Sequence, residues 1–287
     1  MLIGQALGWA SKVLATAGID TARLDAEVLL AEVMRVDRTY LFSHSQDVLA
    51  GDQEELFRIW IYRRYQGLPV AYILGKKEFW SLEFLVTPAV LIPRPESELL
   101  VEGALERTAR AGPTPLIAEV GCGSGAVIIS LARELGRGRF YATDSCPFAL
   151  WIARQNAHRL QVADRISFLR TDLLRGVIGK GWHGRFDQVL SNPPYVPRQE
   201  VRSLPREVRL YEPRRALDGG EDGLYFHRRL LPEAICLLKP GGYLLMEIGQ
   251  GQCQAVLSLL DEEKALAEVE VLRDYRGIER VVCARKG

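Results

Sequence analysis

The stretch LIAEVGCGSGAVIISLAREL, residues 116–135, decides the fold. It begins with a short apolar run (116–120), passes through a turn with three glycines (121–125), and continues with apolar residues at helical spacing. A buried strand followed at once by a glycine turn and a helix is typical of a doubly wound parallel sheet. Such a turn carries few side chains and the helix amides point outward, so its backbone can approach a nucleotide-like ligand.

The alternation of strand and helix continues along the rest of the chain. Further runs rich in β-branched and aromatic residues are expected to be strands: 139–144, 165–172, 186–192, 243–249, 268–274 and 280–286. Helical patterns separate most of these runs, and Pro240-Gly241-Gly242 is expected to form a turn before the run at 243–249. No helix separates the last two runs, so one of them should be antiparallel. The sequence therefore predicts an α/β fold with a doubly wound, mostly parallel seven-stranded sheet.

The residues before this sheet follow a different pattern. Residues 2–66 are predicted to be helical, because apolar residues recur three and four positions apart in LDAEVLLAEVMRV and DQEELFRIWIYRRY. Asp52 and Glu55 suggest the start of the second of these helices, and Gly67 suggests its end. The run KEFWSLEFLVTPAVLI that follows predicts a β-hairpin. We expect three parts: a small helical domain at 1–75, a β-hairpin linker at 76–93 and the α/β domain at 94–287.

Composition excludes several functional classes. Lys plus Arg (37) nearly balance Asp plus Glu (36) among 287 residues, so no strong overall attraction to nucleic acid or to an anionic membrane is expected. No apolar run approaches the roughly 20 residues of a membrane span, and no signal peptide pattern is present. The five cysteines and four histidines form neither a disulfide framework nor metal-ligand spacing, which indicates a reducing cytosol and no metal site.

Two further features place candidate ligand-binding residues beside the glycine turn. The turn itself contributes Gly121, Cys122, Gly123, Ser124 and Gly125, and its loose dinucleotide pattern fits either a nicotinamide cofactor or S-adenosylmethionine. Asp144 ends the next predicted strand, where an acid can bind both ribose hydroxyls of an adenosine or cap the following helix. Asp172 ends the third strand, where Asp172 or the backbone beside Leu173 could meet an adenine edge or serve as a helix cap.

The sequence SNPPY, residues 191–195, ends the fourth strand and therefore lies on the same edge of the sheet as the glycine turn. Proline donates no hydrogen bond and forces the preceding residue into extended conformation, so Asn192 and Pro193 should be held rigidly. The Asn192 side-chain oxygen and the Pro193 carbonyl oxygen could then accept both hydrogens of a planar NH2 group. Pro194 is expected beside them, and Tyr195 is expected to pack on the substrate plane and face a nearby sulfonium.

These motifs carry a resemblance to a known family. NPPY after a nucleotide-type fold resembles class I methyltransferases that modify planar amide or amino nitrogens, including DNA adenine methyltransferases. More closely, the chain resembles the peptide chain release factor glutamine methyltransferases. The matching segments run nearly end to end: LDAEVLLAEVM, PVAYILGKKEFWSLEFLVTPAVLIPRPESELLVE, EVGCGSGAVIISLA, SNPPYVP, YEPRRALDGGEDGLYFHRRLL and LKPGGYLLMEIGQGQ.

The resemblance implies an activity and roles for the candidate residues. It implies methyl transfer from S-adenosyl-L-methionine to the side-chain amide of the glutamine in the Gly-Gly-Gln motif of class 1 release factors. The turn 121–125 and Asp144 would hold the cofactor, with its adenine beside Asp172 and Leu173 and its methyl group near Asn192. Residues 192–195 would bind the glutamine amide, and the helical domain would dock the release factor. We expect a cytoplasmic monomer without stable nucleic-acid binding.

The chain departs from the family pattern at two positions. Ser97 stands where the family often has threonine, which keeps a hydroxyl, and Glu119 stands where aspartate is frequent, which extends any contact with the methionine amino group by one methylene. Phe79 and Arg94 could equally be pocket or structural residues. Two other functions stay open: methylation of an adenine amino group in DNA or RNA, which would require base extrusion and a basic surface, and cofactor binding without catalysis.

Overall fold

The computed structural model describes residues 1–108 and 112–287, which form two compact units. One unit consists of Met1–Lys76 together with Pro205–Tyr211. The other consists of Lys77–Leu204 and Glu212–Gly287. No sequence pattern indicated that the short segment Pro205–Tyr211 belongs with the N-terminal helices.

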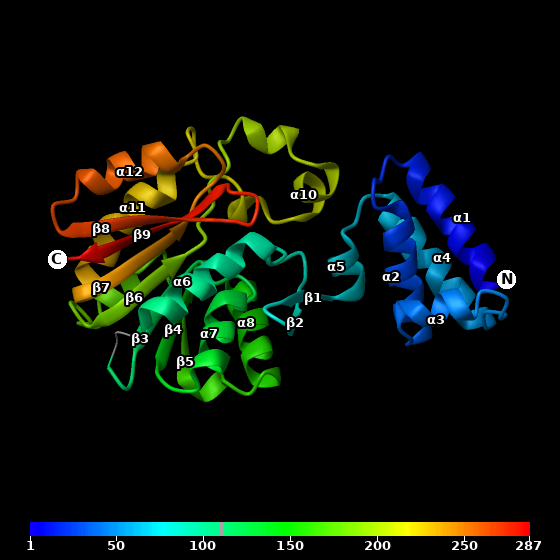
Figure 1. Ribbon diagram of the computed structural model, residues 1–287, viewed down its shortest axis with the longest axis horizontal. Helices are drawn as coiled ribbons and strands as arrows, with labels where there is room; N and C mark the ends of the chain where they lie inside the picture. Colours follow the sequence, from blue (N-terminus) through cyan, green and yellow to red (C-terminus); the bar gives the residue numbers. More distant parts are fainter. Residues whose placement is uncertain (109–111) are drawn as a thin grey trace. The chain divides into compact units, whose positions relative to one another are not determined.

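The first unit is helical, as its apolar spacing predicts (Figure 1). Its helices are α1 (Ile3–Thr16), α2 (Ala22–Met34), α3 (Arg38–Ser43), α4 (Gly51–Tyr65), α5 (Val70–Leu74) and α10 (Arg206–Tyr211). Side chains at three- and four-residue spacing bury one face of each long helix, with Leu29, Leu30 and Phe57 at the centre of the shared core. This burial against neighbouring helices, rather than helix propensity, stabilises such short segments.

A buried arginine joins α10 to this unit. Arg64 donates to Asp25 Oδ2 and to Glu207 Oε2, both at 2.6 Å. The Tyr211 hydroxyl adds a hydrogen bond to the Gln66 carbonyl at 3.1 Å. Because Asp25 and Arg64 are both buried, removing Arg64 would leave the Asp25 carboxylate without its ion-pair partner, which is costly.

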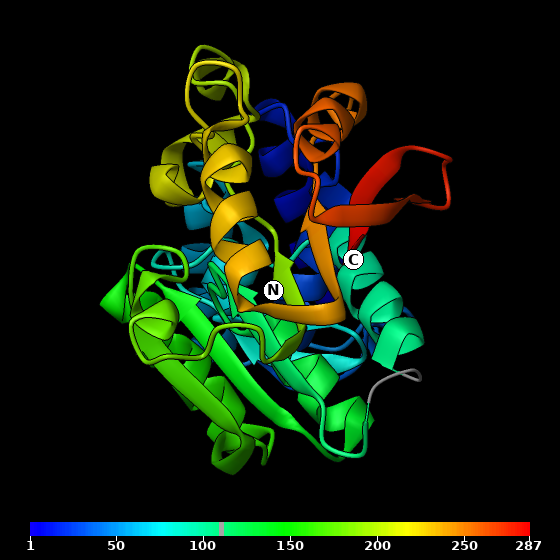
Figure 2. The ribbon, with the colours of Figure 1, turned by 90° about the vertical axis from the view of Figure 1, so that its left-hand side faces the viewer.

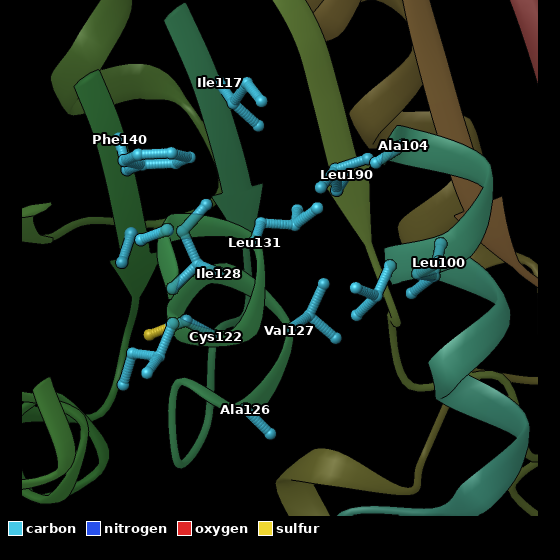
Figure 3. Packing of buried hydrophobic residues seen from close by; sticks show 14 of the residues in the cluster. Leu100, Ala104, Ile117, Cys122, Ala126, Val127, Ile128, Leu131, Phe140 and Leu190 are labelled. Atoms are coloured by element: carbon cyan, nitrogen blue, oxygen red, sulfur yellow. The ribbon is translucent and has the colours of Figure 1, made fainter. Parts of the chain in front are cut away.

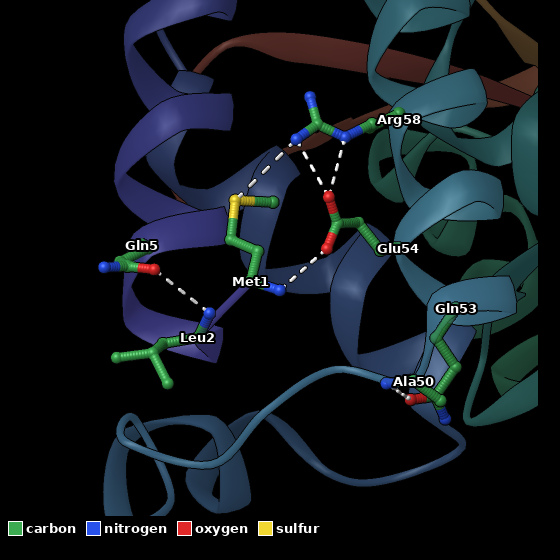
Figure 4. A network of polar contacts seen from close by, with 7 residues as sticks. All are labelled: Met1, Leu2, Gln5, Ala50, Gln53, Glu54 and Arg58. Atoms are coloured by element: carbon green, nitrogen blue, oxygen red, sulfur yellow. Dashed lines mark hydrogen bonds and ion pairs between the residues drawn. The ribbon is translucent and has the colours of Figure 1, made fainter.

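Helix α4 begins two residues before the predicted start. Gln53, not Glu55, makes the capping contact at the start of this helix: its side-chain Oε1 accepts the Ala50 N–H at 3.3 Å. The neighbouring Glu54 carboxylate accepts from the N-terminal amino group of Met1 at 2.8 Å and from Arg58 at 2.9 Å (Figure 4). The predicted end is confirmed, since Gly67 follows the helix with φ +98° and its N–H donates to the Arg64 carbonyl.

The second unit begins with a hairpin of β1 (Lys76–Phe79) and β2 (Leu82–Leu85). Trp80 and Ser81 form its two-residue turn with φ +52° and +55°, the left-handed geometry that matches the twist of hairpin strands. A 3₁₀ turn, η1 (Pro95–Ser97), then leads into α6 (Glu98–Thr108).

The predicted seven-stranded sheet is confirmed, with strand order β5-β4-β3-β6-β7-β9-β8. Its strands are β3 (Leu116–Val120), β4 (Arg139–Asp144), β5 (Ile166–Arg170), β6 (Phe186–Ser191), β7 (Leu238–Glu247), β8 (Leu266–Arg273) and β9 (Glu279–Lys286). Neighbouring strands pair in parallel except that β9 is antiparallel to both β7 and β8, so the expectation of an antiparallel strand at the end is correct.

Helices cover both faces of this sheet (Figures 1 and 2). On one face α6, α7 (Ala126–Leu135) and α8 (Pro147–Arg159) pack over Ile117 and Leu190, as Figure 3 shows for α6 and α7. On the other face α9 (Arg175–Ile178), α11 (Tyr225–Leu237) and α12 (Cys253–Asp261) pack over Ala118 and Val189. The alternation of neighbouring residues between the two faces is the two-residue period of a strand.

Several predicted strand boundaries differ from the structure: β6 ends at Ser191 rather than at 192, and β7 ends at Glu247 rather than at 249. Pro240-Gly241-Gly242 is not a turn before the strand but an irregular part of β7, where the pairing with β6 shifts between Phe186 and Gln188. Strand β5 ends at Arg170, so Asp172 lies two residues beyond it. Among the described residues, no helix is both long enough and apolar enough to cross a membrane.

Candidate active site

A cavity opens at the carboxyl ends of β3, β4 and β6. It occupies about 1090 Å³ counted out to its mouth, and all of its lining residues belong to the second unit. Strand β3 connects to β4 on one side and has β6 on the other, so the cavity lies where the strand order reverses direction. Ligands of doubly wound sheets collect at this position, because the loops on either side diverge there.

The glycine turn forms one wall of the cavity and is built mainly from its backbone. Gly121, Gly123 and Gly125 all have positive φ, between +54° and +81°, which disfavours any other residue. A side chain on Gly121 or Gly123 would meet no protein atom within 4 Å, so these two glycines face open space. Gly125 differs: a Cβ there would lie 2.8 Å from Ile129, and Gly125 does not line the cavity. Its role is to let α7 pack closely.

Asp144 ends β4 as predicted, and its carboxylate accepts hydrogen bonds from two neighbouring segments. Its Oδ2 accepts the Gly123 N–H at 3.0 Å, while its Oδ1 accepts the Cys146 N–H at 2.8 Å at the start of α8. The carboxylate therefore fixes the glycine turn and the helix start together, and it also lines the cavity. Burial raises the pKa of Asp144 above its ordinary value.

Glu119 lies beneath the glycine turn and is 4% exposed. Its Oε2 accepts the Ile128 N–H at 3.1 Å, and the residue lines the cavity. Burial, which outweighs this hydrogen bond, raises the pKa of Glu119 to about 8. A buried acid with a raised pKa in a cavity is a binding or catalytic candidate, and here it would attract a cationic group.

Asp172 and Leu173 also line the cavity. The Asp172 carboxylate forms an ion pair with Arg229 at 2.5 Å and is half exposed, so this pairing competes with any ligand contact. Leu173 has φ +51°, an uncommon conformation for a leucine. The structure therefore favours the backbone beside Leu173, rather than the Asp172 side chain, as the ligand contact at this end of the cavity.

The SNPPY segment forms the wall next to the glycine turn. Asn192, Pro193 and Pro194 line the cavity. The Asn192 side-chain nitrogen donates to Ser97 Oγ at 2.9 Å, which turns its oxygen the other way. Among the residues that the structure describes, no hydrogen bond occupies Asn192 Oδ1 or the Pro193 carbonyl oxygen. Both predicted acceptors are therefore free beside the cavity.

The Tyr195 side chain is held by a contact outside the cavity lining. It does not line the cavity, and its hydroxyl donates to Glu247 Oε1 at 3.3 Å. Burial, together with the nearby Glu247 carboxylate, raises the pKa of the Tyr195 phenol. The hydroxyl is thus directed to a buried acid, and the expectation that the ring packs on the substrate plane stays a prediction.

Two glycine-containing segments, LDGGEDGL and EIGQGQ, pack closely against the backbone of SNPPY. A side chain on Gly223 would approach the Tyr195 carbonyl oxygen to 2.3 Å, and one on Gly219 would approach the Pro194 carbonyl oxygen to 2.8 Å. The Gln252 side chain donates to the Tyr195 carbonyl at 2.9 Å. These contacts give a physical reason for Gly219 and Gly223 in LDGGEDGL and for Gln252 in EIGQGQ.

Several residues of the site were not predicted. Ser97 and Glu247 hold Asn192 and Tyr195, and the buried Asn156 of α8 donates to the Ser124 carbonyl at 2.9 Å and so holds the glycine turn. These polar residues are far in the sequence from the residues that they contact, so no local sequence pattern indicates the contacts. Phe79 and Arg94, which the sequence left open as pocket or structural residues, line the cavity, and so do Arg215 and Phe226, which were not predicted. Among the described residues, no cluster of histidine, cysteine or acidic side chains could hold a metal ion.

Comparison with known proteins places this architecture in a family. The family described as "PrmC N-terminal domain" matches residues 5–75, and the family described as "Methyltransferase small domain" matches residues 96–220. The release factor glutamine methyltransferase of Moorella thermoacetica is 44% identical over 284 residues, covering 99% of this chain and 98% of the relative. The chain belongs to the release factor glutamine methyltransferase family. The enzyme of the same name from Geobacter sulfurreducens is 37% identical, covering 99% of this chain and 97% of the relative.

Solved structures agree with the class I methyltransferase fold. The hMettl16 catalytic domain, in complex with the MAT2A 3'UTR hairpin 6, aligns with a TM-score of 0.57 at 16% identity, covering 81% of each chain. A methyltransferase from Pyrococcus furiosus aligns with a TM-score of 0.51 at 20% identity, covering 74% of this chain and 92% of that chain. At such identities the likeness concerns the fold alone. Members of the glutamine methyltransferase family use S-adenosylmethionine, which resolves the choice of cofactor left open by the glycine turn.

Proposed function

We propose that this chain transfers a methyl group from S-adenosyl-L-methionine to the side-chain amide nitrogen of the glutamine in the Gly-Gly-Gln motif of class 1 peptide chain release factors. One observation carries the proposal: Asn192 and Pro193 line the cavity beside a glycine turn, and within residues 1–108 and 112–287 no hydrogen bond occupies Asn192 Oδ1 or the Pro193 carbonyl oxygen. The full-length similarity to enzymes named for this activity supports the same substrate.

The residues of the cavity fit the cofactor. Gly121 and Gly123 leave open the space that a side chain would fill, so their backbone can approach the ligand. We assign the ribose hydroxyls to Asp144, the adenine to the backbone beside Leu173, and the amino group of the methionine moiety to Glu119. The bound cofactor supplies an electrophilic methyl group on a sulfonium, which is already a good leaving group.

The chain's own contribution is to orient a poor nucleophile. An amide nitrogen shares its lone pair with the adjacent carbonyl, so it attacks a methyl group slowly. Asn192 Oδ1 and the Pro193 carbonyl would each accept one hydrogen of the NH2 group, which fixes its direction and favours pyramidalisation. The nitrogen lone pair would then be directed at the methyl group that the bound cofactor would supply, with the thioether as the leaving group. The nitrogen then loses a proton to water, so no dedicated base is required.

We assign docking of the release factor to the helical unit. Helix α4 exposes four large apolar side chains at three-residue spacing: Leu56, Ile59, Tyr62 and Tyr65. Exposed apolar surface of this kind marks interaction sites. Replacing Tyr62 with glutamate is expected to raise the KM for the release factor, while the Kd of the cofactor stays unchanged. An unchanged KM would assign docking to another surface.

We further propose a cytoplasmic monomer without stable nucleic-acid binding. The net charge is +1, and arginines near SNPPY are paired with acids: Arg198 and Arg214 with Asp218, and Arg94 with Glu212. Such pairing leaves little positive potential for phosphates. Sedimentation analysis tests the monomer, and a duplex-binding titration at two salt concentrations tests the nucleic acid. Tight, steeply salt-dependent duplex binding would contradict this part of the proposal.

The activity itself is tested by transfer of label from radiolabelled S-adenosylmethionine. The acceptors compared are an unmodified release factor, its Gln→Ala variant in the Gly-Gly-Gln loop, and duplex DNA. Label on the unmodified factor alone is expected. Label on DNA alone would mean that the two acceptors bind an adenine amino group instead, and cofactor binding with no transfer to any acceptor would contradict catalysis.

A further inference from the structure

A buried carboxylate ends a chain of hydrogen bonds that begins at the cavity. Asn192 donates to Ser97 Oγ at 2.9 Å, and Ser97 donates to Glu247 Oε2 at 2.6 Å. The other oxygen of the carboxylate, Oε1, accepts the Tyr195 hydroxyl at 3.3 Å. Two of the three polar side chains of the SNPPY segment, those of Asn192 and Tyr195, are thus connected to one acid on another strand, whereas Ser191 donates to the Val120 carbonyl.

The position of Glu247 makes this connection rigid. The residue ends β7, is 1% exposed and does not line the cavity. Its carbonyl oxygen is hydrogen-bonded to the ring Nε2 of the fully buried His227 at 3.0 Å, which fixes the backbone as well. Glu247 therefore cannot contact a substrate in the cavity, and any effect on the reaction must act through Ser97 and Tyr195.

We propose that Glu247 is a positioning residue that fixes the direction of the Asn192 amide, so that the Asn192 oxygen faces the substrate nitrogen. The inference rests on the proposed function and adds a residue to its machinery. It rests on which groups donate and which accept in the hydrogen bonds that connect Asn192, Ser97 and Glu247.

An ionised carboxylate can only accept hydrogen bonds. The single hydrogen of Ser97 is therefore directed to Glu247, and Ser97 Oγ can only accept from Asn192. An acceptor selects the NH2 end of an amide, so the oxygen end of Asn192 is turned away from Ser97. Without the carboxylate, the Ser97 hydroxyl could donate to Asn192 Oδ1, and the amide would lose its preferred direction.

Protonation of Glu247 on Oε2 would have the same consequence, because this oxygen would then donate to Ser97 Oγ and free the Ser97 hydrogen for Asn192. The charged and titratable groups that act on Glu247 are Glu96, Arg280, Tyr195 and, through its main chain, His227. Burial, with a smaller contribution from the Glu96 charge, raises the pKa of Glu247 to about 7, although Ser97 and Tyr195 act in the opposite direction. We expect kcat to fall as the pH decreases below about 7.

The test compares Glu247→Gln and Ser97→Ala with the unmodified protein in single-turnover methyl transfer to the release factor. Each change is expected to lower kcat about 10- to 100-fold, the range typical of groups that orient a functional ligand, while the Kd of the cofactor stays within about twofold. Ser97→Thr keeps the hydroxyl and should recover most of the loss caused by Ser97→Ala. Glu247→Gln should also abolish the fall of kcat below pH 7.

Two comparisons separate positioning from a merely structural role. In an Asn192→Ala background, Glu247→Gln should cause no further loss of kcat, because the group that it orients is absent. Ser130→Ala is the matched control: this serine is fully buried and donates to the Ala126 carbonyl of its own helix at 2.7 Å, so its loss should leave kcat unchanged.

The outcomes are distinct. Full kcat for Glu247→Gln with an unchanged pH profile would overturn the inference, as would an equal loss of kcat in the Asn192→Ala background. If Glu247→Gln fails to fold, Ser97→Ala gives the same test, with cofactor binding as the check on folding. An unmodified protein that does not methylate the release factor would instead contradict the proposed function.

Discussion

The two walls of the cavity follow neighbouring parallel strands, yet they are held in different ways. The glycine turn after β3 is fixed mainly by the adjacent strand β4, through two amides that donate to the Thr143 carbonyl at 2.9 Å and through Asp144. The SNPPY segment after β6 is held by side chains from distant parts of the chain, including Ser97, Glu247 and Gln252. The glycine turn, our proposed cofactor wall, is therefore held mainly by the next strand along the chain, whereas SNPPY, our proposed substrate wall, is held by segments much farther away in the sequence.

This difference predicts that binding and chemistry can be separated by mutation. Changes to the glycine turn and Asp144 should act on cofactor affinity. Changes to SNPPY and its supports should act on the methyl-transfer step with little effect on the cofactor.

The largest effect is expected for Asn192→Ala. Removing one preorganised hydrogen-bonding group from a reacting centre costs about 10²- to 10³-fold in kcat, or about 3–4 kcal/mol. The cofactor Kd, measured by calorimetry, should change far less, because the turn 121–125 and Asp144 are intact. A variant with full turnover and normal cofactor binding would remove the proposed role of Asn192.

Gly223→Ala should distort the backbone of the SNPPY segment, because the new side chain would overlap with the Tyr195 carbonyl and Gln252. Its Cβ would lie 2.3 Å from the Tyr195 carbonyl oxygen and 2.5 Å from Gln252, at φ +78°. Overpacking and the unfavourable φ together are expected to lower the free energy of unfolding by about 3 kcal/mol and to reduce kcat. Denaturant unfolding and single-turnover assays measure the two effects.

Gly277→Ala is the control for this variant. Gly277 has φ +77° but no atom within 4 Å of its Cβ position, so it carries the conformational cost alone, about 1 kcal/mol. Equal destabilisation by both variants would mean that the close approach of Gly223 to Tyr195 contributes nothing.

Asp144→Asn should act mainly on cofactor affinity. The amide has one acceptor oxygen where the carboxylate has two, and it lacks the charge that strengthens hydrogen bonds from ribose hydroxyls. We expect the cofactor Kd to rise about tenfold, while kcat at saturating cofactor changes by less than about threefold. The opposite pattern, a lower kcat with unchanged Kd, would contradict the separation of the two walls.

The smallest expected effect is the dependence of stability on pH. Glu119 binds its proton more tightly in the folded protein, with a pKa of about 8, than in the unfolded chain, with a pKa near 4.5. Folding is therefore favoured at low pH, and this contribution is lost as the pH rises from about 4.5 to about 8. In the ligand-free protein, Glu119→Gln should reduce the fall in Tm over that range. An identical fall in both proteins would show that Glu119 ionises normally.

The same contrast explains how far the sequence predicts the structure. The order of strands and helices, the position of Asp144 and the location of SNPPY beside the glycine turn follow from periodicity and turn chemistry, which are local. The α4 start was misplaced because Gln53 caps the helix through its side chain and Ala50 takes the N-cap position. The segment Pro240-Gly241-Gly242 was read as a turn because its pairing with β6 is a property of the sheet.

The remaining part of the site could not be read from sequence, because its partners are far apart along the chain. Ser97 and Asn192 are separated by 95 positions, and Ser97 and Glu247 by 150. Nothing local to Tyr195 indicates that its hydroxyl is directed to a buried acid instead of the cavity. The resemblance supplied the substrate, whereas the structure supplies the supports that orient its acceptors.

Fragment-ion mass spectrometry of the methylated release factor tests the central claim most directly. Asn192 Oδ1 and the Pro193 carbonyl oxygen would each accept one hydrogen of an NH2 group. The account therefore predicts a single methyl group on the side-chain amide nitrogen of the glutamine in Gly-Gly-Gln. A methyl group on another residue, on a backbone nitrogen or on a carboxyl oxygen of the factor would contradict it.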